Sequence, residues 1–496
     1  MHVILKNLTI PSSGDFDNYT IFIAPPSSSL PCTMIQTKFT KLFKCKIPIL
    51  GAPMAGVSGG LLASTTTNAH ACGLIAGGYL DNLEKLNKEI QIYRSNTMEG
   101  TPVHIGFIGY AAMKDGLERV ESVLKQHQPF SVQFFAPAHT PNGTFQNFEL
   151  ARKYNCKIIA QVGCEKDAID CLEAGVDCLV AQGTEAGGHG LHSELGSGTL
   201  PFSRRCVELA DQISSHTSVL AAGGITDGKG LAAALSLGCD GAVFGTRLWA
   251  SKEALGHVKL KSMLNDATCD DIIRTNVFDK IIGATSPNPW EYPFDSVGCI
   301  HNETSKKYHG KEDVELDNDL KEVGDNNLLN IYKTAVENGN GNICGVWAGE
   351  GVGMITNYNI SANEIIKTAE IECLEQIEKL KSMVKVSVVN NKYMHEGKQV
   401  VRITGCGEIC SGFGSKIIYA DGTTKESSRY DAFDDLIEEF DFVVYKRMAT
   451  DRYHGGPSFE AVPKEDPGEW EEFGEKPINR MTSTQYGWRR KGCGHT

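Results

Sequence analysis

The chain has 496 residues, a formal net charge of −13 and 41% hydrophobic residues. This length allows one large domain plus an additional module, and the composition is ordinary for a globular protein. The negative charge argues against a nucleic-acid-binding surface and against an anionic membrane surface. No apolar run approaches the ~20 residues that a membrane-spanning helix needs. We therefore expect neither a nucleic acid nor a membrane as a partner.

The first 32 residues are rich in Ser and Pro and lack the basic and apolar regions of a signal peptide. They contain no arginine and carry Asp15 and Asp17, which also fits a mitochondrial transit peptide poorly. We expect residues 1–32 to form a flexible extension. The 16 cysteines are scattered rather than clustered, which is typical of reduced thiols and indicates a cytoplasmic protein.

Short apolar runs alternate with helix-like segments between residues 47 and 247. The runs are 47–54, 73–78, 103–109, 130–136, 157–163, 178–183, 218–224 and 241–247. Most are continuously apolar, as expected for parallel strands that are buried on both faces. This repeated alternation predicts an α/β fold, a (β/α)8 TIM barrel over residues 33–383. An open doubly wound sheet is less favoured, because polar and glycine residues follow nearly every strand and not only those at one switch point.

Two segments extend the predicted barrel. Polar residues dominate 251–360, an insertion after strand eight whose charged middle, 302–327, is expected to be mobile. A capping-box pattern at Ser361 then opens a helix to about Met383, which we expect to pack against the barrel wall. Residues 384–496 form a small C-terminal extension of unknown role, β-rich or partly disordered. Strands are predicted there at 384–389, 400–404, 416–420 and 440–445.

The strongest candidate for chemistry lies in residues 177–190. An apolar run ends there in a glycine-rich turn that contains His189. Barrel strands deliver catalytic groups to the mouth of the barrel in this way. Imidazole titrates near neutral pH, so His189 is the candidate acid/base group. The alternative interpretation is a glycine-rich turn with a solvated histidine.

Glycines after the last two barrel strands predict a phosphate site. Gly223 and Gly224 end the seventh strand, and the run Val243-Phe244-Gly245-Thr246 ends the eighth. In barrels of this kind these two loops hold a phosphate through backbone N–H groups, and glycine permits the close approach. Two tight turns without a ligand are the alternative interpretation.

Residues at the ends of three other strands suit a planar heteroaromatic ring. Ala52, Pro53 and Met54 form a rigid corner after the first strand, and Gln161 and Gln182 close the fifth and sixth. A methionine can pack on a flat ring, and a glutamine amide can pair with both donor and acceptor atoms of that ring. A phosphate site, a ring site and a histidine together predict bound FMN beside an acid/base group.

Residues 33–382 resemble the nitronate monooxygenases, formerly called 2-nitropropane dioxygenases, in their fungal-type class. The matching stretches are 48–56 (PILGAPMAG), 177–190 (DCLVAQGTEAGGHG), 220–225 (LAAGGI), 243–247 (VFGTR) and 347–353 (WAGEGVG). The third strand departs from many bacterial relatives, which carry an asparagine at its end.

This resemblance implies FMN held by Gln182, Gly187, Gly224 and the 243–246 run, with His189 as the catalytic base. It also implies a small-molecule reaction. An alkyl nitronate such as propionate-3-nitronate would be oxidised by O₂ to a carbonyl compound and nitrite or nitrate. The sequence leaves the oligomeric state open.

Several other functions remain alternatives. The same barrel could carry an NAD(P)H-dependent flavin reductase of quinone or enoyl-acyl carrier protein type. A barrel like that of inosine monophosphate dehydrogenase would need a loop cysteine after strand six, where this chain has His189. A zinc-binding module in the C-terminal region would use Cys406, Cys410, His454, Cys493 and His495. That spacing is irregular and contains no paired CxxC, so we expect no metal.

Overall fold

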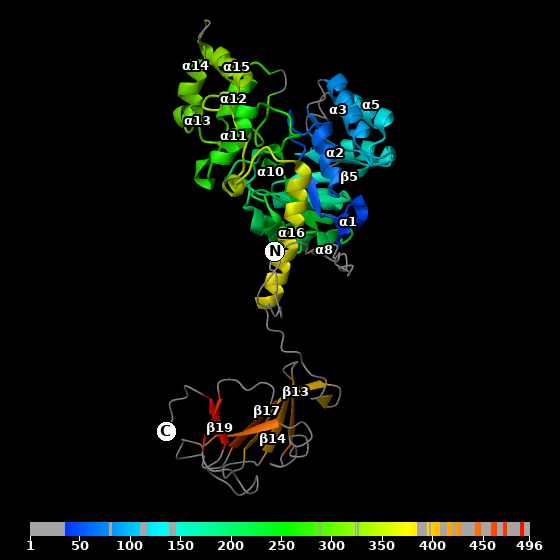
Figure 1. Cartoon of the computed structure of the whole chain (residues 1–496), viewed down its shortest axis with the longest axis vertical. Helices are drawn as coiled ribbons and strands as arrows, with labels where there is room; N and C mark the ends of the chain where they lie inside the picture. The colour runs from blue at the N-terminus through cyan, green and yellow to red at the C-terminus, as the bar shows by residue number, and fades with distance from the viewer. Residues whose placement is uncertain are drawn as a thin grey trace, which may run out of the picture. The chain divides into compact units, whose positions relative to one another are not determined.

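The computed structural model describes residues 35–383 except 79–81, 110–116, 138–144, 287–288, 323 and 325–326, together with segments between 394 and 490. Contacts within the chain divide it into two units, Met1–Met383 and Val384–Thr496. Each unit is described by itself. Figure 1 shows helices around a sheet in the first unit and strands in the second.

The first unit contains an eight-stranded parallel sheet whose neighbours follow one another along the chain. Its strands are β1 (Ile49–Gly51), β2 (Ile75–Gly78), β3 (His104–Ile108), β4 (Ser131–Phe135), β5 (Lys157–Val162), β6 (Cys178–Gln182), β8 (Ser218–Ala222) and β9 (Gly241–Phe244). β1 pairs with β9, and Leu50 forms a parallel bridge to Cys72, just before β2. The sheet therefore curls back on itself. The predicted TIM barrel is confirmed, and the doubly wound alternative is wrong because the strand order never reverses.

Helices alternate with these strands and cover the outside of the sheet (Figure 1). They are α2 (Gly60–Asn68), α3 (Leu83–Ser95), α5 (Leu117–His127), α6 (Gln146–Lys153), α7 (Glu165–Glu173), α8 (Thr199–Ile213), α9 (Gly228–Ser236) and α16 (Ala362–Met383). One apolar cluster fills the layer between strands and helices. A second fills the barrel interior, where Leu50, Val180 and Leu220 meet Phe39 and Phe43. The two phenylalanines come from α1 (Lys38–Phe43), so α1 packs against the interior core.

The long helix α16 packs against α9 and α2, as the sequence predicted. It thereby completes the outer layer between the last and the first strand–helix units. Its first turn is held by Glu253, whose carboxylate accepts hydrogen bonds from the Ser361 hydroxyl at 2.7 Å and the Ala362 N–H at 2.9 Å. Glu253 lies at the start of the insertion, about a hundred residues before the helix that it caps. The sequence around Ser361 therefore does not predict this contact.

The insertion between β9 and α16 folds on its own core. Its elements are α10 (Thr246–Trp249), α11 (Val258–Asp266), η1 (Cys269–Asp271), β10 (Ile272–Thr275), α12 (Val277–Gly283), β11 (Ser296–Ile300), α13 (Glu303–Tyr308), η2 (Glu312–Leu316), α14 (Asp317–Lys321), α15 (Leu328–Asn338) and η3 (Glu350–Met354). The described residues of the charged middle, which was expected to be mobile, form the helices α13, η2 and α14. Tyr308 and Leu316 from that stretch are buried against Phe278 and Tyr332, so the helices are anchored despite their charged surface.

The second unit contains antiparallel strands. They are β12 (Met394–His395), β13 (Lys398–Cys406), β14 (Gly414–Tyr419), β15 (Thr424–Ser427), β16 (Phe442–Arg447), β17 (Ser458–Pro463), β18 (Trp470–Phe473) and β19 (Gly487–Arg490). The first six form one sheet and the last two form another. The strands predicted at 400–404, 416–420 and 440–445 overlap β13, β14 and β16. Residues 384–389, 420 and 440–441 of the predicted strands lie outside the described residues.

The structure bears on the zinc alternative and on the membrane prediction only through its described residues. Cys406 ends β13, but the other four candidate ligands lie outside the described residues. In the part of the chain that is described, no cluster of His, Cys, Asp and Glu has the composition of a metal site. No described helix is both long enough and apolar enough to cross a bilayer.

His104 gives the barrel a testable dependence on pH. Its ring is buried at the start of β3. Nδ1 lies 2.7 Å from the Ser131 hydroxyl, and the ring makes a T-shaped contact with that of Phe130. Burial lowers the pKa of His104 from about 6.5 to about 4. The unfolded chain binds this proton below about pH 6.5, whereas the folded chain resists it until about pH 4. The stability that His104 contributes above pH 6.5 is therefore lost as the pH falls toward 4.

We expect His104→Gln to lose less unfolding free energy than the parent between about pH 7 and about pH 5. Urea unfolding of both proteins at the two pH values measures this difference. Equal losses in the two proteins would show that His104 does not resist protonation in the fold.

Candidate active site

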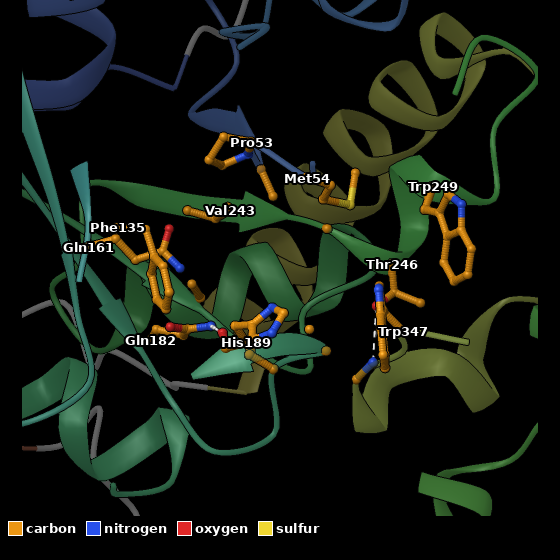
Figure 2. Close-up of a pocket in the computed structure, with 18 of the residues that line it drawn as sticks. Pro53, Met54, Phe135, Gln161, Gln182, His189, Val243, Thr246, Trp249 and Trp347 are labelled. Atoms are coloured by element: carbon orange, nitrogen blue, oxygen red, sulfur yellow. Dashed lines mark hydrogen bonds between the residues drawn. The ribbon is translucent and has the colours of Figure 1, made fainter. Parts of the chain in front are cut away.

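A cavity of about 230 Å³ lies at the carboxyl ends of the barrel strands. TIM barrels bind their ligands at this end. Twelve of the thirteen residues that the sequence nominated line the cavity. They are Ala52, Pro53, Met54, Gln161, Gln182, Gly187, His189, Gly223, Gly224, Val243, Gly245 and Thr246. Figure 2 shows Pro53 and Met54 on one side of the cavity and Gln182 and His189 on the other.

Phe244 is the nominated residue that does not line the cavity. Successive residues of a strand point to opposite faces, so Val243 faces the interior and Phe244 faces outward. Its side chain is fully buried between the strands and the surrounding helices. The Phe244 side chain therefore does not reach the cavity, and a cofactor contact at this position would come from its backbone, which stays a prediction. The side chain supports the site from behind.

The predicted phosphate side of the cavity contains polar atoms without partners. Gly223 and Gly224 adopt φ values of 115° and 67°, a conformation that favours glycine. The Thr226 hydroxyl and the Trp249 indole nitrogen are buried and have no hydrogen-bond partner among the described residues. Both residues line the cavity. Leaving such groups unpaired is costly, so the site suits a ligand that carries several hydrogen-bonding oxygens.

Gly187 lets two loops meet without side chains between them. A Cβ at Gly187 would lie 2.5 Å from the backbone of Ala348 and Gly349. A Cβ at Gly349 would likewise lie 2.6 Å from the Glu185 carbonyl. The Gly349 N–H also donates to the Thr246 hydroxyl at 3.1 Å, drawn as a dashed line in Figure 2. The loops that carry Gly187, Gly349 and Thr246 therefore meet closely and form one wall of the cavity.

His189 lies on a short strand, β7 (Gly188–Gly190), where the sequence predicted only a turn. β7 pairs antiparallel with β11, and β11 pairs with β10. Gln182 at the end of β6 also donates from Nε2 to the His189 carbonyl at 2.8 Å (Figure 2). The backbone that carries the imidazole is therefore held from two sides. The strand was not visible in the sequence because its partner lies in the distant insertion.

The His189 imidazole has two close partners. Its Nε2 lies 2.8 Å from Oδ1 of Asp279 in α12. One face of the ring stacks on the Trp290 indole, with centroids 3.7 Å apart and planes tilted by 16°. Since Asp279 occupies Nε2, Nδ1 is the ring nitrogen left to exchange a proton with a ligand. A buried carboxylate at this position fixes the tautomer and stabilises the imidazolium that forms when Nδ1 accepts a proton.

Arg274 of β10 fastens the loop that precedes His189. Its buried guanidinium donates to the carbonyls of Ala186 at 2.6 Å and Ser296 at 3.0 Å. It also lies 3.4 Å from the Gly188 carbonyl. Burial lowers the pKa of Arg274 to about 10, and the charge of Asp279 partly opposes this shift. Arg274 thus joins the barrel loop to the insertion sheet and brings a positive charge near the buried carboxylate.

Sequence reasoning missed several residues of this site, among them the groups around His189 and the lining residues Phe135, Thr226 and Trp249. Asp279 and Arg274 carry no local motif, and Trp290 lies in a polar stretch that gave no periodic pattern. The one available signal was the density of aromatic residues between 290 and 294. Trp347, which also lines the cavity, lies in a stretch already matched to the family.

Together, the barrel, the cavity at its carboxyl end and the hydrogen-bonded His189–Asp279 pair define a TIM-barrel enzyme. A family model described as nitronate monooxygenase matches residues 36–370. The chain therefore belongs to the nitronate monooxygenase family and is an oxidoreductase.

Individual relatives agree with this assignment. A nitronate monooxygenase from Neurospora crassa is 27% identical over 374 residues, covering 67% of this chain and 91% of the relative. A probable nitronate monooxygenase from Staphylococcus saprophyticus is 27% identical over 376 residues, covering 68% and 98%. Because a fungal and a bacterial protein match equally, the fungal-type class stays a prediction.

Solved structures resemble the barrel. FabK from Thermotoga maritima superposes with a TM-score of 0.58 at 24% identity, covering 71% of this chain and all of that chain. Nitroalkane oxidase from Streptomyces ansochromogenes gives a TM-score of 0.54 at 24% identity, covering 68% and 99%. At this identity the likeness supports the fold alone.

Proposed function

We propose that this protein uses FMN and O₂ to oxidise alkyl nitronates, propionate-3-nitronate among them, to a carbonyl compound and nitrite or nitrate. The observation that carries the proposal is the His189–Asp279 pair, with an Nε2 to Oδ1 distance of 2.8 Å, in the cavity of a nitronate monooxygenase family barrel. A proton acceptor is what a neutral nitroalkane needs to become a nitronate.

The cavity fits FMN in its chemistry. The backbone of Gly223, Gly224 and Gly245 would surround the phosphate, and the unpaired Thr226 hydroxyl would donate to its oxygens or to the ribityl chain. Across the cavity, Met54 would pack on the flavin ring, and Gln161 and Gln182 would pair with its polar edge. Bound FMN supplies the electron transfer that no side chain here can perform.

The protein's own groups handle the proton and the substrate. Nδ1 of His189 removes the proton from the carbon that bears the nitro group, while Asp279 holds Nε2 and balances the new charge. A preformed nitronate has already lost this proton and needs only to be bound. Phe135, Trp290 and Trp347 line the cavity and exclude water from the reacting carbon.

Purified full-length protein tests this function through its visible spectrum and its oxygen uptake. We expect a flavin spectrum and uptake that depends on propionate-3-nitronate, with no oxidation of NADH. A flavin that NADH reduces, in a protein silent toward nitronates, would favour the flavin reductase alternative. Absence of bound flavin even after FMN is added would contradict the assignment of the cavity.

Two further proposals concern organisation and location. We propose that residues 33–383 carry the activity and that 1–32 and 384–496 are extensions to it. The cysteines of the described residues are free thiols, most of them buried, which supports a reducing cytoplasmic location.

A further inference from the structure

We propose that Trp290 is a specificity-determining residue, and that His192 and Asp295 are positioning residues that hold it against His189. Resting on the proposed function, this inference names the substrate class: nitronates with a short substituent on the reacting carbon. The argument concerns residues 290–295, called here the 290–295 segment, which leads into β11.

Trp290 contacts two aromatic rings that line the cavity. Its indole stacks on the His189 imidazole at 3.7 Å between centroids. It also meets the ring of Phe135, the last residue of β4, at 5.8 Å and 60°. Phe135 in turn meets Phe294 edge-on at 5.8 Å. Both Trp290 and Phe135 line the cavity, so the indole occupies volume directly beside the His189 ring.

The 290–295 segment is fastened to the strand that carries His189. Just beyond it, Ser296 pairs with Gly190 and Val297 with His189 across β11 and β7. Within it, Oδ1 of Asp295 lies 2.8 Å from Nε2 of His192. The fastening therefore lies at the C-terminal end of the segment.

His192 makes a second contact with the same segment. Its ring lies 5.4 Å from that of Tyr292, and its Nδ1 is 3.5 Å from the Glu194 carboxylate. The His192 side chain is 18% exposed and that of Asp295 23%. Neither residue lines the cavity, so their influence on a substrate passes through the position of Trp290.

A fixed indole beside His189 limits the size of the substrate. A long or branched substituent on the reacting carbon must displace Trp290, which would break its contacts with His189 and Phe135 together. A short substituent leaves them intact. Discrimination by the shape of an apolar pocket reaches about 10–200-fold, which sets the scale of the effect.

The first test compares the anions of nitroethane and phenylnitromethane as substrates. We expect Trp290→Ala to raise the ratio of kcat/KM for the bulky anion over the small one by about tenfold or more. Both substrates are measured on the same variant, so a loss of activity caused by damage to His189 affects both values of kcat/KM and cancels in their ratio. Trp290→Phe, which keeps a stacked ring, should give a smaller change. An unchanged ratio in Trp290→Ala would overturn the proposal.

The second test asks whether His192 acts through Trp290. We expect His192→Gln to change the same ratio in the same direction, by about threefold, and to add nothing in the Trp290→Ala background. Arg205→Gln, which removes an exposed ion pair with Glu165 on the outer helices, serves as the matched control and should leave the ratio unchanged. Additive effects of His192→Gln and Trp290→Ala would show that His192 does not position the indole.

A binding measurement separates this inference from the proposed function. Acetate and benzoate copy the flat two-oxygen head of a nitronate and do not react. Calorimetric titration should show that Trp290→Ala gains affinity for benzoate relative to acetate by about tenfold. If the parent protein does not turn over nitronates, the proposed function is wrong. The binding comparison would still test the role of Trp290, because it does not depend on turnover. No gain for benzoate would defeat the role of Trp290 alone.

Discussion

We expect His189→Asn to lose turnover of neutral nitroalkanes by about 10²–10⁴-fold while it still oxidises preformed nitronates. Asparagine preserves a polar side chain but cannot accept the proton at neutral pH. Its amide ends near the position of Nδ1, so the Nε2 contact with Asp279 and the ring that stacks on Trp290 are lost as well. The preformed anion reports these structural losses, and the difference between the two substrates isolates the loss of the base. The measurement is oxygen uptake with nitroethane and, separately, with its preformed anion.

The control for this substitution is a histidine elsewhere in the barrel. His104→Gln changes a buried ring that does not line the cavity, and it should leave both activities near those of the parent protein. Equal loss of the two activities in His189→Asn would contradict the role of His189 as base. It would point instead to a role in binding the nitronate or the cofactor.

The barrel was predictable because its signal is local and repeated. Each strand is an apolar run of a few residues followed by glycine or polar residues, and no distant partner is needed to recognise it. The glycines at 223–224 and Met54 were located for the same reason, since chain order alone places strand ends around one mouth. The side chain of Phe244 lies outside the cavity because a motif names consecutive residues, while strand geometry alternates the faces to which their side chains point.

The insertion was not predictable in the same way. Its helices bury residues such as Tyr308 and Leu316 against partners far along the chain, and a charged composition hides these few anchors. β7 formed where a turn was expected because β11 supplies the pairing. Asp279, Trp290 and Arg274 reach the site through that same tertiary arrangement, so no local pattern announces them.

Asp279→Asn should separate stability from activity. Oδ1 of Asp279 meets His189, but Oδ2 is buried with no hydrogen-bond partner among the described residues. An incompletely paired buried carboxylate destabilises a fold, and such strain is retained where it serves a reaction. We therefore expect the variant to be at least as stable as the parent protein in urea, because it removes this charge and keeps the size of the side chain.

The same variant should lose about 10²–10⁴-fold in turnover of neutral nitroalkanes and much less with preformed nitronates. The amide can still contact Nε2 of His189, but it carries no charge to balance the imidazolium formed when Nδ1 takes the proton. Oxygen uptake with nitroethane and with its anion, beside urea unfolding of the same preparation, gives both readouts. Nitroalkane turnover within about threefold of the parent protein would show that Asp279 only packs against the histidine. A fall in stability together with equal loss on both substrates would show that the carboxylate holds α12 in place and does not support the base.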